Sequence, residues 1–242
     1  MLYYDHNGIT IFCGDCLEVM PDIPDRTIDA VLADLPYGTT DALWDSVIPL
    51  DKLWKAYKRV CRPRAAVVLN AREPFTSMLV TSNPKAYRHK WVWNKGQTGN
   101  FALAKYMPLQ IDEDVLVFGF DAVDYYPQMR TGMARHKGGA REGAALWSGI
   151  KQGVSTHNDQ YYPTNIISLT NLRNKEHPTE KPIELLQYLI CTYTKLGDLI
   201  LDNTMGSGTT CLAARNTGRR FIGIEKDEGY YKVACERMGI AL

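Results

Sequence analysis

The sequence lacks long apolar segments and has no marked excess of either charge. No stretch approaches the roughly 18 consecutive apolar residues that a membrane-spanning helix needs, and the start has no basic region followed by an apolar run. We therefore expect a cytoplasmic protein that does not associate with membranes. The net charge of +1 leaves nucleic acid open as a partner, because a nucleic-acid binder can gather its basic residues on one face.

Disulfide and metal-binding patterns are also missing. The six cysteines are scattered through apolar segments, which indicates reduced thiols in the core. Cys13 and Cys16 form the only close pair, with no second pair and no histidine at ligand spacing, so we expect neither a metal site nor a redox CxxC. Internal repeats and low-complexity tracts are absent as well.

Short apolar runs alternate with helical patterns along most of the chain. Apolar residues recur at helical spacing in residues 53–61, 183–194 and 211–216. The alternation predicts an α/β fold with a mainly parallel sheet and helices on both faces. The seven runs with strand character are residues 9–14, 30–35, 65–69, 90–93, 115–119, 199–201 and 221–224.

The alternation fails in residues 121–172, which we interpret as an insertion in a domain formed by residues 1–120 and 173–242. Gly, Arg, Lys, His and Asn interleave there with aromatic residues, and from Arg130 to Lys151 five basic residues stand against one acidic residue. Such a segment suits phosphate contact and base stacking, although long loops are also simply solvated.

Residues 34–37 (Asp-Leu-Pro-Tyr) directly follow an apolar run. Ligands of open parallel sheets bind beyond the carboxyl ends of the strands, so chemistry is expected at this turn. The Asp34 carboxylate and the Leu35 carbonyl can hold the hydrogens of a conjugated amine and aim its lone pair at an electrophilic carbon. Tyr37 can stack on the base that carries the amine. The alternative is an ordinary strand-end Asp in a turn that contains Pro36.

A glycine-rich turn, residues 202–210, lies between the predicted strand 199–201 and the predicted helix 211–216. Glycines at a helix start let the backbone approach a ligand closely. The next predicted strand leads to Glu225, 23 residues beyond Asp202, a distance that fits hydrogen bonding to ribose hydroxyls. A dehydrogenase is the competing interpretation, but the glycines do not spell GxGxxG.

Residues 177–182 (His-Pro-Thr-Glu-Lys-Pro) lead into the predicted helix 183–194. Lys181 offers a cation and Thr179 a hydroxyl to an amino-acid carboxylate or its surroundings. The alternative is a proline-rich helix entry with Thr179 as its cap. His177 alone is more often a structural histidine than a catalytic base.

Together, these three segments resemble the amino-group DNA methyltransferases of the β class, particularly small phage and prophage adenine methyltransferases. The resemblance covers most of the chain outside the insertion, and its specific feature is the catalytic motif preceding the cofactor glycines. It implies a seven-stranded Rossmann-like sheet with one antiparallel strand, S-adenosylmethionine as cofactor, double-stranded DNA as substrate, and target recognition by residues 121–172. It also implies a bacterial or phage-infected cell, and leaves a homodimer and a partner restriction endonuclease open.

The resemblance assigns a role to each motif residue. Residues 34–37 are similar to the Asp-Pro-Pro-Tyr catalytic motif, and Leu35 replaces a proline without removing the carbonyl acceptor. The catalytic residues are then Asp34, Leu35, Pro36 and Tyr37. The implied cofactor contacts are Asp15, Asp34, His177, Thr179, Lys181, Asp202, Met205, Gly206, Ser207, Gly208, Thr209 and Glu225. Our candidates for DNA contact are Trp44, Lys95, Arg130, Arg135, Lys137 and Arg141.

Asp rather than Ser at position 34 favours adenine N6 over cytosine N4 as the methyl acceptor, again by resemblance. Methylation of cytosine carbon 5 requires a nucleophilic cysteine, usually after a proline, and no Pro-Cys pair occurs. We therefore predict direct transfer to adenine N6, with cytosine N4 as the alternative. RNA or protein-amide methylation, or a noncatalytic DNA-binding module with a vestigial cofactor pocket, are more distant. Trp91 and Trp93 belong to the target pocket or to the core.

Overall fold

The computed structural model describes residues 2–6, 8–38, 46–136, 157–170 and 181–240. The chain divides into a large unit, Met1–Tyr126 and Asn165–Leu242, and a small unit, Pro127–Thr164. The predicted insertion, residues 121–172, contains the small unit and extends beyond it at both ends. Among the described residues, no helix is both long enough and apolar enough to cross a membrane.

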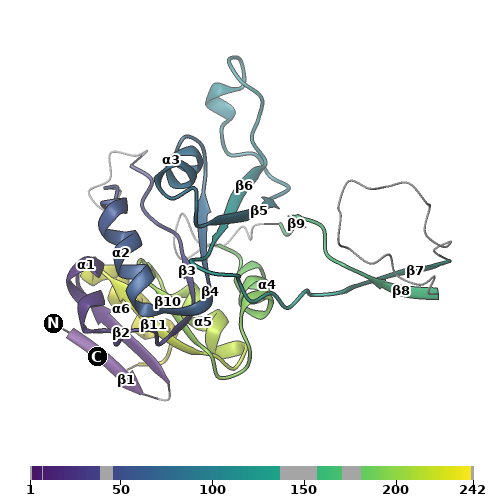
Figure 1. Cartoon of the computed structure of the whole chain (residues 1–242). Helices are drawn as coiled ribbons and strands as arrows, with labels where there is room; N and C mark the ends of the chain where they lie inside the picture. Colours follow the sequence, from purple (N-terminus) through teal and green to yellow (C-terminus); the bar gives the residue numbers. More distant parts are fainter. Residues whose placement is uncertain (1, 7, 39–45, 137–156, 171–180, 241–242) are drawn as a thin grey trace. The chain divides into compact units, whose positions relative to one another are not determined.

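The large unit is built on a nine-stranded sheet with the strand order β1-β2-β11-β10-β3-β4-β6-β5-β9 (Figure 1). The strands β2, β11, β10, β3 and β4 are parallel neighbours, and β6 runs antiparallel to both β4 and β5. The bounds are β1 Leu2–His6, β2 Ile9–Cys13, β3 Ile28–Ala33, β4 Cys61–Ala71, β5 Tyr87–Asn94, β6 Asp112–Phe118, β9 Ile166–Ser168, β10 Leu199–Asp202 and β11 Arg220–Glu225.

Seven of these strands coincide with the seven predicted runs, and they include the single antiparallel strand that the resemblance implied. The prediction of seven strands is corrected at both edges of the sheet. β1 pairs antiparallel with β2, and β9 pairs parallel with β5. Both are edge strands, and β9 has only three residues, which is too short for an alternating pattern to be recognised.

Helices cover both faces of the sheet, which explains why the central strands are apolar throughout. In β3, Ala30 and Leu32 belong to one core cluster, whereas Val31 and Ala33 belong to the other. The first cluster includes residues of α4 (Ile183–Tyr193), α5 (Thr209–Asn216) and α6 (Glu228–Arg237), and the second includes residues of α1 (Cys16–Val19), α2 (Leu50–Val60) and α3 (Phe75–Ser82). Two short 3-10 helices are η1 (Met20–Asp22) and η2 (Phe101–Leu103).

The small unit contains an antiparallel pair of strands, β7 (Arg130–His136) and β8 (His157–Tyr161). Arg130 pairs with Tyr161, and the register shifts between Thr131 and Arg135. The Tyr161 hydroxyl donates to the Met133 carbonyl at 2.6 Å, so the side chain of one strand supports the backbone of the other.

Candidate active site

Four acidic residues from the predicted motifs lie at the carboxyl ends of four neighbouring strands. Asp34 follows β3, Asp202 ends β10, Glu225 ends β11, and Asp15 lies two residues beyond β2. These strands are parallel neighbours in the order β2-β11-β10-β3, so residues from both ends of the chain meet at these carboxyl ends. At one such meeting point, the Gly14 amide donates to the Glu225 carbonyl at 2.8 Å.

Thr204 connects the Asp34 turn to the glycine-rich turn. Its hydroxyl donates to the Asp34 backbone carbonyl at 3.1 Å, and its amide donates to the Asp202 carboxylate at 3.1 Å. The two predicted motifs are therefore neighbours across β3 and β10. A structure with the two turns far apart would have excluded a shared site.

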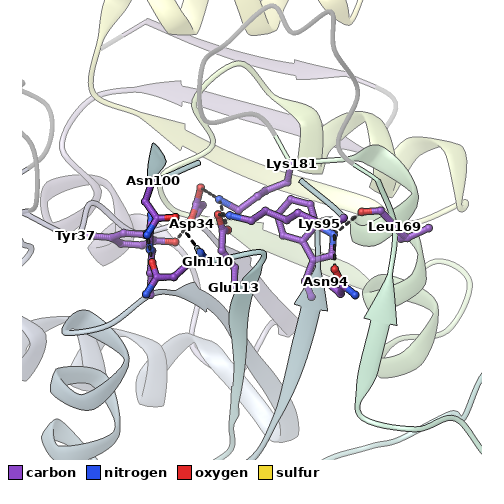
Figure 2. A network of polar contacts seen from close by, with 12 residues as sticks. Asp34, Tyr37, Asn94, Lys95, Asn100, Gln110, Glu113, Leu169 and Lys181 are labelled. Carbon is purple, nitrogen blue, oxygen red and sulfur yellow. Dashed lines mark hydrogen bonds and ion pairs between the residues drawn. The ribbon is translucent and has the colours of Figure 1, made fainter. Parts of the chain in front are cut away.

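The Asp34 carboxylate receives a donor at each of its oxygens, as Figure 2 shows. The Tyr37 hydroxyl donates to Oδ1 at 2.8 Å, and the Lys181 ammonium donates to Oδ2 at 2.7 Å. The Lys181 side chain is 10% exposed, whereas the Asp34 side chain is 29% exposed. The Lys181 ammonium is thus shielded from water, whereas the Asp34 carboxylate is still in contact with water. The shielding strengthens the attraction between the ammonium and the carboxylate.

A chain of alternating charges continues behind Asp34. Glu113, on β6, lies 3.4 Å from the Lys181 ammonium and 3.0 Å from the Lys95 ammonium. Burial acts to raise the pKa of Glu113, but the two lysines outweigh it and leave this pKa lowered. Burial acts to lower the pKa of Lys181, but Asp34 and Glu113 outweigh it and leave that pKa raised. Both groups therefore carry their charges at neutral pH.

Tyr37 has one ring face against the protein. Its ring stacks on Phe75, the first residue of α3, with centroids 5.1 Å apart and planes 27° from parallel. Burial, followed by the neighbouring Asp34 carboxylate, raises the pKa of Tyr37 well above its usual value, so the phenol remains a donor. Beside this ring (Figure 2), the nearly buried Asn100 accepts the Gln110 amide at 2.8 Å.

The glycine-rich turn is held largely by its backbone. The Gly206 amide donates to the Glu225 carboxylate at 2.8 Å. Gly206 and Gly208 have φ angles of +53° and +80°, in the left-handed region that favours glycine. A Cβ atom on Gly208 would lie 3.0 Å from the Cβ of Ala234, whereas one on Gly206 would have no neighbour within 4 Å among the described residues. The backbone at Gly206 is therefore open to a ligand.

Side chains of α6 hold the rest of this turn. The Arg237 guanidinium donates to the Ser207 hydroxyl at 2.8 Å and to the Thr209 hydroxyl at 3.1 Å. Met205 is buried, and its amide donates to the Ile224 carbonyl at 3.0 Å. The predicted cofactor residues of this turn thus form one rigid piece between β10 and α5.

The two acids that border the glycine-rich turn are largely removed from water. Burial raises the pKa of Asp202 to about 7, and it also raises the pKa of Glu225. The second Glu225 oxygen accepts the Asp227 amide at 2.8 Å. Carboxylates with raised pKa values, such as these two at the carboxyl ends of β10 and β11, are typical of functional sites.

Asp15 lies at the end of the acidic row beside β11. One oxygen of its carboxylate caps α1 by accepting the Leu17 amide at 2.9 Å, and the other pairs with Lys226 at 3.1 Å. Its side chain is one-third exposed. The contact that we predict between Asp15 and the cofactor stays a prediction.

Several predicted residues lie outside the described ranges, namely Trp44, Lys137, Arg141, His177 and Thr179. Arg130 is exposed at the start of β7 and donates to the Tyr162 carbonyl at 3.2 Å. The backbone of Arg135 lies in β7. The roles of all these residues stay predictions.

Lys95 and Lys181 form ion pairs inside the protein, and Trp91 and Trp93 follow the core alternative of their prediction. Lys95, a candidate for DNA contact, is 13% exposed and paired with Glu113. Lys181, a candidate for the cofactor carboxylate, contacts the Asp34 carboxylate at 2.7 Å, and its contact with the cofactor stays a prediction. Trp91 and Trp93 are 3% and 0% exposed, so they belong to the core.

Sequence reasoning missed Glu113. It lies among Asp112 and Asp114 at the start of β6, where three consecutive acids resemble a solvated strand end. Its partners come from other elements, through the pairing of Glu113 with Trp93 of β5 and the approach of Lys181. No signal in the sequence marks these long-range contacts.

Comparisons with known proteins agree with this geometry. Residues 28–236 match the N6/N4 methyltransferase family, described as DNA methylase. The chain is 29% identical to the DNA adenine methyltransferase YhdJ of Escherichia coli K12, over 98% of this chain and 85% of the relative.

Two solved structures share the fold. The M1.HpyAVI–SAM complex has a TM-score of 0.66 and 22% identity, and covers 95% of this chain and 99% of its own. The cytosine-N4-specific PvuII DNA methyltransferase has a TM-score of 0.69 and 16% identity, with coverages of 95% and 86%. The segment that matches the family contains the Asp34 turn, Lys181, the glycine-rich turn and Glu225, and the chain belongs to the N6/N4 DNA methylase family.

Proposed function

We propose that this DNA methyltransferase transfers a methyl group from S-adenosylmethionine to N6 of adenine in double-stranded DNA. The observation that carries the proposal is the connection of Asp34 to the glycine-rich turn through Thr204. Thr204 thereby joins two neighbouring groups at the carboxyl ends of β3 and β10. One is a carboxylate that can hold an amine, and the other is a turn that can hold a methyl donor.

The residues of the turn suit the cofactor. Gly206 leaves open space for the methionine part, and the carboxylates of Glu225 and Asp15 can accept hydrogen bonds from ribose hydroxyls and the adenine amine. The Glu225 oxygens already accept two backbone amides, which fixes the carboxylate while leaving lone pairs for a ligand. When bound, S-adenosylmethionine supplies a methyl group on a positively charged sulfur.

Asp34 and Leu35 prepare the amine for transfer. The lone pair of adenine N6 is delocalised into the ring, so the amine is a poor nucleophile. The Asp34 carboxylate and the Leu35 carbonyl hold its two hydrogens and favour a tetrahedral nitrogen. A carbon–nitrogen bond then forms, the carbon–sulfur bond breaks with its electron pair left on sulfur, and the nitrogen loses one proton. The Asp34 carboxylate can accept that proton.

Tyr37 changes partner when the base enters. Its hydroxyl occupies Oδ1 of Asp34 at 2.8 Å, which is an oxygen that the amine needs. Because one ring face is covered by Phe75, the other face is the one that stacks on the extruded base. The entering adenine therefore replaces one hydrogen bond of the Asp34 carboxylate with another.

Residues 121–172 recognise the target in this proposal, and Arg130, Arg135, Lys137 and Arg141 contact phosphates. An exposed two-stranded ribbon with basic residues suits backbone contact, which positions a protein on DNA without specifying sequence. Trp44, which lies outside the described residues, remains a candidate for contact with DNA.

Three observations bear on the identity of the base. Adenine is favoured by Asp34 in place of Ser and by the near full-length similarity to an adenine methyltransferase. Cytosine N4 is the second candidate, because the PvuII enzyme, which is cytosine-N4-specific, shares the fold. Both bases present an amine that the same two acceptors can hold.

The test is chemical identification of the product. Unmethylated duplex DNA is incubated with the protein and isotope-labelled S-adenosylmethionine, digested to nucleosides and analysed by mass spectrometry. We expect labelled N6-methyladenine with the parent protein and none with the isosteric Asp34→Asn variant. Label found only in N4-methylcytosine would replace adenine by cytosine, and no labelled base would remove the proposal.

A further inference from the structure

We infer that Lys181 is a positioning residue for methyl transfer, which fixes the Asp34 carboxylate in its charged and oriented form while Glu113 holds Lys181 from behind. This inference rests on the proposed function, because it requires Asp34 to be the acceptor of the base amine. It differs from the sequence-based expectation that Lys181 binds the carboxylate of the cofactor.

Three elements converge on the Lys181 ammonium. It lies 2.7 Å from Asp34 after β3 and 3.4 Å from Glu113 on β6, and its own residue immediately precedes Pro182, the N-cap of α4. Figure 2 shows the ammonium between the two carboxylates. Its low exposure of 10% means that water contributes little to balancing these charges.

Glu113 depends on Lys181 for compensation at one oxygen. Its Oε2 atom is buried and has no hydrogen-bond partner among the described residues, so the ion pair with Lys181 is the balancing contact at that atom. The other oxygen is bound by Lys95 at 3.0 Å. Moving Lys181 toward another anion would leave a buried carboxylate oxygen without compensation, which is costly.

Charge counting also argues against a cofactor carboxylate at Lys181. The ammonium already faces two carboxylates, Asp34 and Glu113, of which Glu113 also contacts Lys95. A third carboxylate would add an anion to a cluster of two anions and two cations that has little water. The position of Lys181 suits a residue that acts through Asp34.

The charged and titratable groups around Asp34 define the effect of losing Lys181. Tyr37 contacts Asp34 from the same turn, Glu113 lies behind it on β6, and Asp202 on β10 senses its charge. Lys181 is the cation that contacts Asp34, whereas Lys95 contacts Glu113. Without Lys181, Asp34 faces the negatively charged Glu113, and a neighbouring negative charge favours protonation of a carboxylate.

The experiment compares Lys181→Met, Lys181→Arg and Glu113→Gln with the parent. Single-turnover methylation is measured across pH, and S-adenosylmethionine affinity is measured by calorimetry. In Lys181→Met we expect the acid limb of the rate profile to move up by about one pH unit or more. At pH values below the acid limb of the parent, the single-turnover rate of the variant is then roughly tenfold lower than that of the parent. The affinity for S-adenosylmethionine stays within about threefold of the parent value. Lys181→Arg keeps the charge and restores the parental limb.

Glu113→Gln provides a change of opposite sign. It removes a negative charge while leaving Lys181, so the acid limb moves to lower pH or stays in place. This variant also decides the matter if Lys181→Met does not fold, since an upward shift in Glu113→Gln would overturn the inference.

Two other outcomes would overturn it as well. A loss of cofactor affinity beyond about tenfold in Lys181→Met, with an unchanged acid limb, would return Lys181 to the cofactor. A rate lowered equally at every pH would make its role purely structural. The base identity is separate, because a parent that produces only N4-methylcytosine refutes the adenine proposal while its pH profile still tests Lys181.

Discussion

The large unit and the small unit handle charge in opposite ways. In the large unit, Lys95, Glu113 and Lys181 are paired and shielded from water. In the small unit, Arg130 is exposed and its side chain bonds to the Tyr162 carbonyl. Buried pairs fix the geometry of single atoms, whereas exposed charges act on any anionic surface nearby. Chemistry and DNA affinity should therefore respond to different substitutions.

Removal of the central carboxylate should have the largest effect. Asp34→Ala leaves the amine without its charged acceptor, so we expect the single-turnover rate to fall by on the order of 10³-fold or more. Cofactor affinity, measured by calorimetry, should change little because the glycine-rich turn keeps its own contacts. Equal turnover by variant and parent would contradict the role of this carboxylate.

The glycine-rich turn allows a matched comparison between stability and cofactor binding. Gly208→Ala combines a left-handed backbone with a 3.0 Å contact to Ala234, so we expect it to lower the free energy of unfolding by about 2 kcal/mol. Gly206→Ala carries the backbone strain of about 1 kcal/mol without the contact, but its methyl group enters the open space.

The two glycine variants should therefore separate in two assays. Thermal melting of the free protein should place Gly208→Ala below Gly206→Ala, whereas titration with S-adenosylmethionine should show the weaker binding in Gly206→Ala. Parental cofactor affinity in Gly206→Ala would mean that the ligand does not approach the backbone there.

Asp202 should make the free energy of unfolding of the large unit depend on pH. Burial raises its pKa from 3.8 to about 7, so between these values the folded protein holds a proton that the unfolded chain has released. The free energy of unfolding is therefore highest, as far as Asp202 is concerned, below about pH 3.8. It falls as the pH rises from 3.8 to about 7, because the unfolded chain ionises in this range while the buried carboxyl group of the folded protein keeps its proton.

Asp202→Asn removes this loss, because the amide cannot ionise and still offers an oxygen to the Thr204 amide. Denaturant unfolding at several pH values should show the variant gaining stability relative to the parent as the pH rises from about 4 to about 7, by at most about 4 kcal/mol. A difference that is constant with pH would show that Asp202 titrates normally.

The parts of the fold that the sequence predicted are those with a local cause. β3 is apolar on both faces because both faces are covered, so Ala30 to Ala33 stand out as a strand. The Asp34 turn and the glycine-rich turn were located by the strands before them, and parallel order brought them to one edge.

What the sequence did not predict depends on contacts between distant elements. Glu113 meets Lys181 across 68 positions of the chain, through the place of β6 in the sheet and the entry to α4. Neither residue has neighbours in sequence that reveal the other. The ion pair between Lys181 and Asp34 could not be predicted for the same reason, since a lysine before a helix fits a ligand contact as well as an internal ion pair.

The smallest effect should come from a single exposed charge in the small unit. Arg130→Gln should leave the single-turnover rate at saturating DNA unchanged. If Arg130 contacts one phosphate, the slope of log affinity against log salt should become shallower by about 0.9. Lys232→Gln on α6, which removes one exposed charge from the large unit, is the matched control and should keep the parental slope. Equal changes in both variants would mean that DNA responds to the net charge of the whole protein, and the division of labour between the two units would then be wrong.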